Sequence, residues 1–150
     1  MYVGLGGATV TKVDQSDIWA VINRRFHTEL GYATESKSSG GARLHRTIMA
    51  HRITKGMTVD HINGDVLDNR KYNLRVCSQN ENSLNRNPKK DGRKFKGVRR
   101  SCNSPNYVAR IAFRGVEYHL GTFATPEEAA RAYNDAARRL HGEFARLNKA

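Results

Sequence analysis

The sequence has 150 residues, 38% of them hydrophobic and 27% charged, which suits one ordinary domain or two very small ones. Its longest apolar runs are only a few residues, and no basic stretch followed by an apolar core opens the chain. We therefore expect neither a membrane span nor a secretory signal. Cys77 and Cys102 are too few for a disulfide framework or a four-cysteine zinc site, and a reducing, cytoplasmic setting is expected.

Positive charge is the first functional signal. The chain carries 26 Lys and Arg against 14 Asp and Glu, a net charge of +12. The excess lies toward the C-terminus, because residues 88–150 hold 14 basic and 6 acidic side chains whereas residues 1–43 hold 5 and 4. This gradient favours nucleic acid as a partner, through the release of counterions from phosphates. The alternative is charge kept only for solubility or for nonspecific association.

Residues 1–43 have the features of an accessory segment, and we expect them to pack beside the domain that follows. A short strand is predicted over residues 8–13, and a strand end with a turn over residues 31–41. Between them, four apolar residues at helical spacing predict a helix whose N-cap is Asp14 or Ser16. These apolar residues are Ile18, Trp19, Ile22 and Phe26.

A second helical stripe is predicted over residues 44–53. It contains His45 and His51, which lie six positions apart and so do not share one helical face. We therefore do not expect them to form a paired metal site. For His45 a structural role is favoured over a DNA contact.

Residues 57–87 predict a compact unit in the order strand, loop, strand, helix. The strands are residues 57–62, rich in β-branched side chains, and residues 73–77. Asn, Asp and Gly supply the turns between them, where Asp65 and Asp68 are expected to serve the turns. Ser78 and Glu81 form a capping box that predicts the start of the helix. Leu84 would be its apolar anchor and Pro88 its end.

Within this unit the segments "VDHINGDVLDNRKYNLR" and "SQNENSLNR", with Leu44-His45-Arg46 upstream, closely resemble the HNH endonuclease family in its phage and intron-homing branch. The resemblance covers roughly residues 8–87 and is most specific over residues 59–86. It implies a small fold called the ββα-metal finger, with two strands, one helix and a bound cation. The spacing Asp60-His61, Asn73 and Asn82 carries the resemblance, since an Asp-His pair alone is common.

The resemblance implies a role for each of these residues. Asp60 and Asn82 would supply hard oxygen ligands for Mg²⁺ or Mn²⁺. His61, on the other side of the strand, would take a proton from water as general base. Asn73 would tie the loop between the strands and hold His61 in place. The neighbours Asn80 and Asn85 match the family spacing less well than Asn82. Arg86 is either a phosphate contact or a solvated helix end.

The last third of the chain predicts a second unit after a basic linker over residues 88–94. Three strands are predicted near residues 95–100, 107–113 and 116–123, with a hairpin turn at Gly115. A helix then begins at an N-cap, Thr125, with Pro126 and Glu128 in its first turn, and Gly142 stops it.

Residues 95–148 closely resemble the ethylene-response-factor (Apetala-type) DNA-binding domain of plants through "FKGVRR", "YVARIAF", "YHLGTFATPEEAARAYNDAARRLHG" and "ARLN". The resemblance implies a three-stranded antiparallel sheet packed on one helix, with the sheet in the DNA major groove. It places Lys96, Arg99, Arg110 and His119 toward DNA, and Thr122 and Tyr133 against the phosphate backbone. Ser101, Asn103, Glu117 and His119 stand where several plant Arg and Trp residues would be, so the plant target sequence is not inferred.

The sequence therefore predicts an α+β protein with an HNH domain over residues 1–87, a linker over residues 88–94 and a DNA-binding domain over residues 95–150. We expect a metal-dependent, nicking, homing-type endonuclease acting on double-stranded DNA. As implied by the family, it would be phage-encoded, work in the bacterial host cytoplasm and be a monomer or weak dimer. The alternative is a non-catalytic DNA-binding protein with a degenerate finger. An RNA-binding protein is less favoured, because the paired aromatic residues of many such modules are missing.

Overall fold

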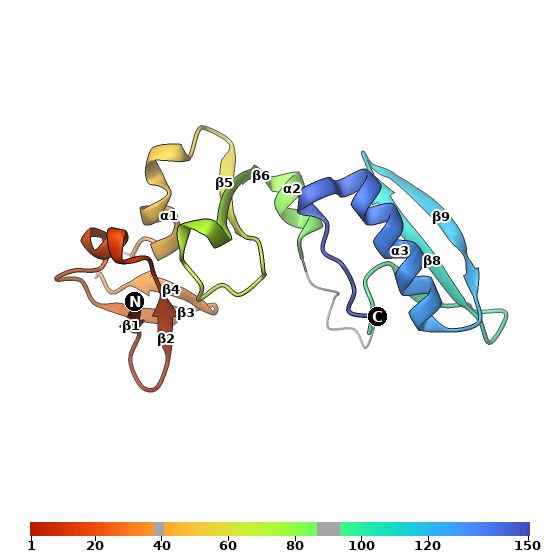
Figure 1. Ribbon diagram of the computed structural model, residues 1–150, viewed down its shortest axis with the longest axis horizontal. Helices are drawn as coiled ribbons and strands as arrows, with labels where there is room; N and C mark the ends of the chain where they lie inside the picture. The colour runs from red at the N-terminus through yellow and green to blue at the C-terminus, as the bar shows by residue number, and fades with distance from the viewer. Residues whose placement is uncertain (38–40, 87–93) are drawn as a thin grey trace. The chain divides into compact units, whose positions relative to one another are not determined.

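The computed structural model describes residues 1–37, 41–86 and 94–150 (Figure 1). The chain divides into two compact units, Met1–Asn82 and Ser83–Ala150. The expected linker over residues 88–94 lies outside the described residues apart from Lys94. Among the helices of the described ranges, none is long and apolar enough to cross a membrane.

The N-terminal segment forms two antiparallel hairpins rather than a long helix. The first pairs β1 (Tyr2–Gly4) with β2 (Val10–Lys12), and the second pairs β3 (Phe26–Glu29) with β4 (Tyr32–Glu35). Between the hairpins lies a short 3-10 helix, η1 (Gln15–Ala20).

The predicted helix over residues 14–26 is therefore wrong beyond its first turns. Asp17 already leaves helical geometry, and Asn23 has a positive φ of 57°, so the chain turns before Phe26 opens a strand. Asp14 does not cap the helix. Its carboxylate instead accepts a hydrogen bond of 2.8 Å from the backbone N–H of Lys71.

One hydrophobic core joins this segment to the rest of the first unit. After β4 come α1 (Leu44–Ile48) and the 3-10 helix η2 (Ala50–Arg52). The N-terminal hairpins, α1 and the next two strands all contribute buried side chains, so residues 1–43 do pack beside the following domain as expected. The core residues are Leu5, Val13, Ala20, Val21, Phe26, Ala33, Leu44, Ile48, Met49, Val59 and Leu74.

The predicted order of strand, loop, strand and helix is confirmed. β5 (Met57–His61) pairs antiparallel with β6 (Leu74–Ser78), which is preceded by the 3-10 turn η3 (Lys71–Asn73) and followed at once by α2 (Gln79–Leu84). The capping box is also present. The Ser78 N–H donates to the Glu81 carboxylate over 2.7 Å, and the Glu81 N–H donates to Ser78 Oγ over 3.2 Å. The expected helix end at Pro88 lies outside the described residues.

The loop between β5 and β6 is held by two carboxylates, as the turn signals predicted. Asp65 Oδ1 accepts from the Leu67 N–H over 3.1 Å. Asp68, which is buried, accepts two hydrogen bonds of 2.7 Å from Nε and Nη2 of Arg70. The Arg70 guanidinium thereby holds the pKa of the Asp68 carboxyl below its ordinary value, against the opposing effect of burial. This ion pair fixes the part of the loop that follows His61.

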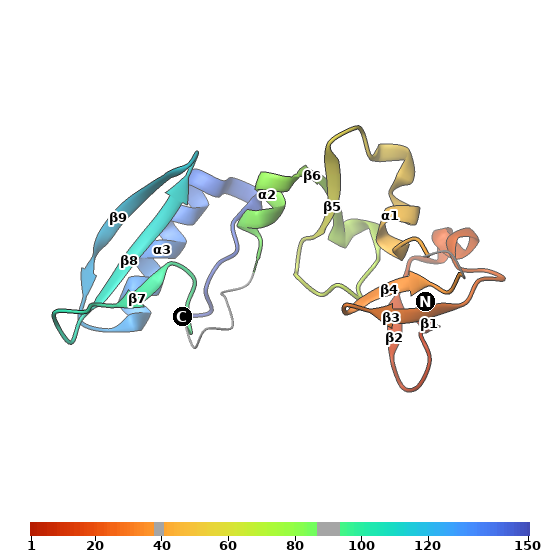
Figure 2. The ribbon, with the colours of Figure 1, turned by 180° about the vertical axis from the view of Figure 1, so that it is seen from behind.

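The second unit is a three-stranded antiparallel sheet covered on one face by a helix, as predicted (Figure 2). Its strands run in the order β7 (Val98–Arg100), β8 (Tyr107–Phe113) and β9 (Val116–Phe123). The covering helix is α3 (Pro126–His141), followed by the 3-10 turn η4 (Gly142–Phe144).

The predicted turn and caps of this unit are confirmed. Arg114 and Gly115 both have positive φ, 50° and 82°, in the turn between β8 and β9. Thr125 accepts from the Glu128 N–H over 3.3 Å and donates its own N–H to the Glu128 carboxylate over 3.2 Å.

Small residues let α3 approach the sheet closely. Ala129, Ala130 and Ala137 are fully buried, and they face Ala109 and Ile111 of β8. Gly97, just before β7, is the tightest point of this packing. Its φ is +73°, and a Cβ there would lie 2.1 Å from Cδ2 of Tyr133 and 2.5 Å from the Arg110 carbonyl oxygen. Only glycine fits that position without moving the ring or the strand.

We predict that Gly97→Ala destabilises the second unit by about 3 kcal/mol, because backbone strain and overpacking combine. Gly115→Ala is the matched control. Gly115 also has a positive φ, +82°, but no atom lies within 4 Å of the added Cβ, so strain alone should cost about 1 kcal/mol. Urea unfolding followed by circular dichroism measures both. Equal losses would show that contact with Tyr133 does not matter.

The Asp68–Arg70 pair predicts a specific dependence of stability on pH. Because the folded-state pKa of Asp68 is lowered, its contribution is complete above the ordinary carboxyl pKa and is lost as pH falls through the folded value. In Arg70→Leu this loss should be smaller, so the free energy of unfolding falls less between about pH 5 and pH 2 than in the wild type. In Asp68→Asn the free energy of unfolding should depend on pH as weakly as in Arg70→Leu. Urea unfolding across this range tests the prediction, which fails if the wild-type slope persists in both variants.

Candidate functional site

Asp60 lies in β5 directly opposite Arg75 of β6, and the two side chains form an ion pair. Nη2 and Nε of Arg75 donate to the same oxygen, Oδ2 of Asp60, over 2.8 and 3.0 Å. Asp60 is only 7% exposed, so the carboxylate sits in a setting where a countercharge is strongly favoured. The sequence did not single out Arg75, because its pairing with Asp60 depends on the register of the two strands.

His61, the next residue, projects from the opposite face of the strand, toward the core that contains Val59 and Leu74. Its Nε2 shares a hydrogen bond of 3.0 Å with Oδ1 of Asn69, and the side chain is 4% exposed. Burial lowers the pKa of His61, outweighing the hydrogen bond to Asn69 and the negative charges nearby, which raise it. A lowered pKa favours the uncharged imidazole, which is the form that can accept a proton.

His45 is a buried neighbour of His61, in agreement with the structural role favoured from the sequence. The two rings meet edge to face with centroids 4.9 Å apart, and the Tyr32 ring lies 5.3 Å from His45. Burial, followed by the charges of His61, Arg43 and Arg46, lowers the pKa of His45 to about 3. His45 thus packs as an uncharged ring that limits where the His61 ring can turn.

Asn73 is buried and joins both sides of the loop that follows His61. Its Nδ2 donates to the Asp68 carbonyl over 2.8 Å, and its Oδ1 accepts from the Asn63 N–H over 3.0 Å. Its backbone carbonyl accepts from the Ile62 N–H over 2.9 Å. Hydrogen bonds of this kind can tie the loop between the two strands, which is the role that the family resemblance implies for Asn73.

Asn82 lies in α2, half-buried, in the same compact unit as Asp60. Asn85, its neighbour one turn later, is buried, and Arg86 is exposed just beyond the helix. Throughout the described ranges no group of three or more His, Cys, Asp and Glu is placed to hold a metal ion. The expected site differs from such a group, since it combines one carboxylate with one amide oxygen. Both are the hard donors that Mg²⁺ and Mn²⁺ prefer, so the residue types fit a divalent cation.

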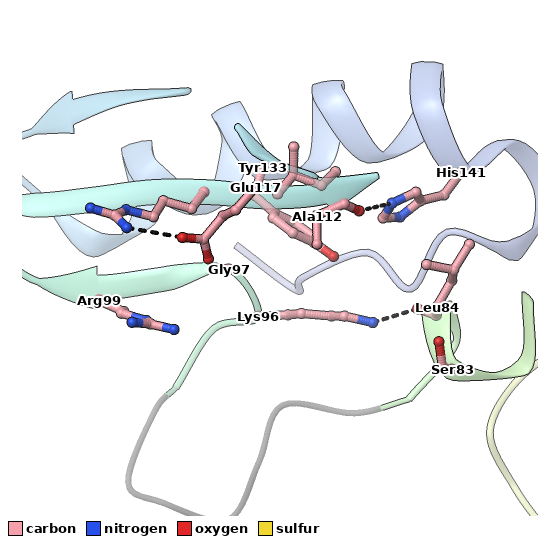
Figure 3. A pocket seen from close by; sticks show the side chains of 11 residues that line it. Ser83, Leu84, Lys96, Gly97, Arg99, Ala112, Glu117, Tyr133 and His141 are labelled. Carbon is pink, nitrogen blue, oxygen red and sulfur yellow. Dashed lines mark hydrogen bonds and ion pairs between the residues drawn. The ribbon is translucent and has the colours of Figure 1, made fainter. Parts of the chain in front are cut away.

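Four of the residues expected to meet DNA share the sheet face that points away from α3. The strand register pairs Arg99 with Val108 and Val108 with Thr122, and it pairs Arg110 with His119. Arg99, Arg110, His119 and Thr122 are all exposed. Arg110 also donates from Nη1 to the Glu117 carboxylate over 2.9 Å. Both residues line an open pocket, in which Glu117 is labelled in Figure 3.

The two remaining residues expected to contact DNA, Lys96 and Tyr133, are less exposed than these four, and their DNA contacts stay predictions. Tyr133 is 2% exposed, packs its ring against Gly97, and has its pKa raised to about 12 by burial, so it is a core residue. The Lys96 ammonium donates to the backbone carbonyl of Leu84 (Figure 3). It also donates to the backbone carbonyl of Arg86 over 3.0 Å. Burial, followed by the charges of Arg146 and Arg86, lowers the pKa of Lys96 to about 8. A family resemblance indicates which residues occupy matching positions, but it does not indicate how buried each of them is in this chain.

The C-terminal part of the chain is similar to plant transcription factors. Ethylene-responsive transcription factor ERN2 of Medicago truncatula is 48% identical over 66 residues, which cover 42% of this chain and 21% of the plant protein. The chain therefore spans about a fifth of that relative, and the match supports a fused DNA-binding domain. No solved structure matches the chain.

The N-terminal part matches a different family. The model of the HNH endonuclease family matches residues 42–84. Protein 3.8 of Escherichia phage T7 is 33% identical over 96 residues, which cover 63% of this chain and 78% of that protein. An uncharacterized HNH endonuclease of Acanthamoeba polyphaga mimivirus is 32% identical over 139 residues, 89% of this chain and 72% of its own length. With a match of that extent, and with the Asp-His, Asn and Asn pattern placed on a hairpin and its helix, the chain belongs to the HNH endonuclease family.

Proposed function

We propose that this protein is a metal-dependent DNA endonuclease that hydrolyses phosphodiester bonds at Asp60 and His61, with DNA held by the C-terminal sheet. The observation that carries the proposal is the buried imidazole of His61 directly after the carboxylate of Asp60 in β5. A proton acceptor and a cation ligand are the two groups that metal-assisted hydrolysis of a phosphodiester requires.

In this mechanism His61 accepts a proton from water while the water oxygen attacks phosphorus. The bond from phosphorus to the 3′ oxygen breaks on the opposite side, and that oxygen takes a proton from solvent. His45 and Asn69 hold the His61 ring from two sides, which favours a fixed direction of attack. Asn73 keeps the loop after His61 in one conformation, and we assign it this positioning role.

Asp60 and Asn82 would hold a divalent cation, Mg²⁺ or Mn²⁺, through one carboxylate and one amide oxygen. Such an ion would stabilise negative charge on the scissile phosphate and on the leaving oxygen. Arg75 orients the Asp60 carboxylate by two hydrogen bonds to one of its oxygens. Two protein ligands leave room for phosphate and water in the coordination sphere.

With one such site in the chain, a single copy is expected to nick one strand. A double-strand break would then need two copies or two successive events. The homing-type role and a phage origin remain expectations from the family resemblance. A DNA-binding protein without catalysis is the competing function, which the first experiment below separates from an enzyme.

We predict that the protein converts supercoiled plasmid to nicked circles with Mg²⁺ or Mn²⁺, and that EDTA abolishes this. His61→Ala should lower the rate roughly 10²- to 10⁴-fold, because it removes the general base. His51→Ala is the matched control, since His51 is an exposed histidine of η2 outside the proposed site and should leave the rate unchanged. Intact plasmid, with gel-shift binding equal in wild type and His61→Ala, would instead establish the non-catalytic protein.

The outward sheet face predicts how binding responds to salt. Arg99→Gln and Arg110→Gln should each weaken DNA binding and lower the slope of log affinity against log salt by roughly one. Arg138→Gln is the matched control, because Arg138 is an exposed arginine of α3, paired with Asp135 over 2.8 Å, and its loss changes net charge equally. Fluorescence anisotropy at several salt concentrations measures the slopes. If Arg138→Gln has the same effect as the sheet variants, binding reflects overall charge and not this face.

A further inference from the structure

A chain of hydrogen bonds joins His61 to β2 in the accessory N-terminal segment. His61 Nε2 lies 3.0 Å from Oδ1 of Asn69, and Nδ2 of Asn69 donates to Oγ1 of Thr11 over 2.7 Å. The Thr11 hydroxyl in turn donates to the Leu67 carbonyl over 2.7 Å. Thr11 is 0% exposed and Asn69 is 1% exposed, so the chain is enclosed in the protein.

Counting protons along this chain fixes the direction of every bond. The Thr11 hydroxyl has one proton, which it gives to the Leu67 carbonyl, so toward Asn69 it can only accept. Asn69 must therefore present its NH₂ group to Thr11 and its oxygen to His61. An amide oxygen cannot donate, so the proton between Asn69 and His61 belongs to Nε2.

We propose that Thr11 and Asn69 are positioning residues that hold His61 in the tautomer protonated at Nε2. The basic lone pair is then on Nδ1, which is the atom that would take the proton from water. This inference rests on the proposed function, which it deepens by naming the reacting nitrogen. It also gives residues 1–43 a role in the chemistry, since Thr11 lies outside the part of the chain that matches the family model, residues 42–84.

The opposite tautomer would require Asn69 to turn its amide over. The amide oxygen would then face Thr11, whose proton would have to leave the Leu67 carbonyl to meet it. That carbonyl would keep only the bond of 2.8 Å from the Lys12 N–H. Because these groups are buried, giving up one hydrogen bond is costly, and the chain favours one orientation.

The test is to read the tautomer directly from the ¹⁵N chemical shifts of the His61 ring, at a mildly alkaline pH where the ring is uncharged. The His61→Ala spectrum identifies the His61 signals. In the wild type we expect Nε2 to show the shift of a protonated ring nitrogen and Nδ1 that of an unprotonated one. A wild-type ring protonated at Nδ1, or one averaged between the two forms, would overturn the inference without any variant.

Thr11→Val and Thr11→Ser form a matched pair, because only serine keeps the hydroxyl that orients Asn69. Thr11→Val should shift the ring toward a mixture of tautomers and lower kcat for plasmid nicking roughly ten- to hundredfold, the range for partners that orient a histidine. KM and Mn²⁺ affinity should change little. Thr11→Ser should restore the wild-type ¹⁵N shifts and most of kcat. A Thr11→Val protein that folds, by thermal unfolding, and keeps the wild-type tautomer would overturn the role of Thr11.

Failure of the inference and failure of the proposed function give different results. The ¹⁵N measurement uses neither DNA nor metal, so it reports the tautomer even if the protein does not cut DNA. If the expected tautomer is present and His61→Ala nicks at the wild-type rate, the proposed base is wrong while the hydrogen-bond chain stands. If His61→Ala is inactive and the wild-type ring is protonated at Nδ1, the enzyme stands and the assignment of the reacting nitrogen falls.

Discussion

The antiparallel pairing of β5 with β6 is the constraint on which the candidate active site depends. Since neighbouring residues of a strand point to opposite faces, one register sends Asp60 to the side of Arg75 and His61 to the side of the hydrophobic core. A slip of one residue would exchange these environments, placing a carboxylate in the core and the imidazole beside a guanidinium. The Asp68–Arg70 pair and the Asn73 bonds hold the connecting loop and so oppose that slip.

Residues 1–43, which lie outside the ββα unit, help to stabilise the pairing of β5 with β6. Residues 1–43 provide six of the nine buried core residues that lie outside β5 and β6. Such a small ββα unit buries too little apolar surface to be stable alone. The N-terminal segment therefore supplies core packing, and through Thr11 it reaches within two hydrogen bonds of His61.

Local signals in the sequence predicted much of the fold. The capping boxes at Ser78 and Thr125 and the turn at Arg114-Gly115 depend on residues only a few positions apart, and all three are present. The predicted helix over residues 14–26 was wrong because the helical spacing of apolar residues did not reveal that the chain leaves helical geometry at Asp17 and turns at Asn23. Asp60, His61, Asn73 and Asn82 were predicted as site residues because their spacing resembles a family pattern.

What the sequence could not show is which distant side chains complete the site. Thr11 and Asn69 lie 58 positions apart, and no periodicity links them. Arg75 opposes Asp60 only once the strand register is known. Tyr133 and Lys96 were assigned to DNA by position, but the close approach of α3 at Gly97 buries the first, and nearby carbonyls bind the second. Burial arises from tertiary packing, so it becomes visible only in the folded chain.

The ion pair between Asp60 and Arg75 has a consequence for how the enzyme is controlled. A buried carboxylate that already has a guanidinium partner does not depend on a cation to be tolerated. A cation at Asp60, as proposed, would compete with the positive charge of Arg75, and this competition would weaken its binding in the absence of substrate. A DNA phosphate would offset that repulsion by adding negative charge beside the ion. If Asp60 holds the cation as proposed, loading of the cation and arrival of DNA would be coupled, and the nuclease would be restrained until its substrate is in place.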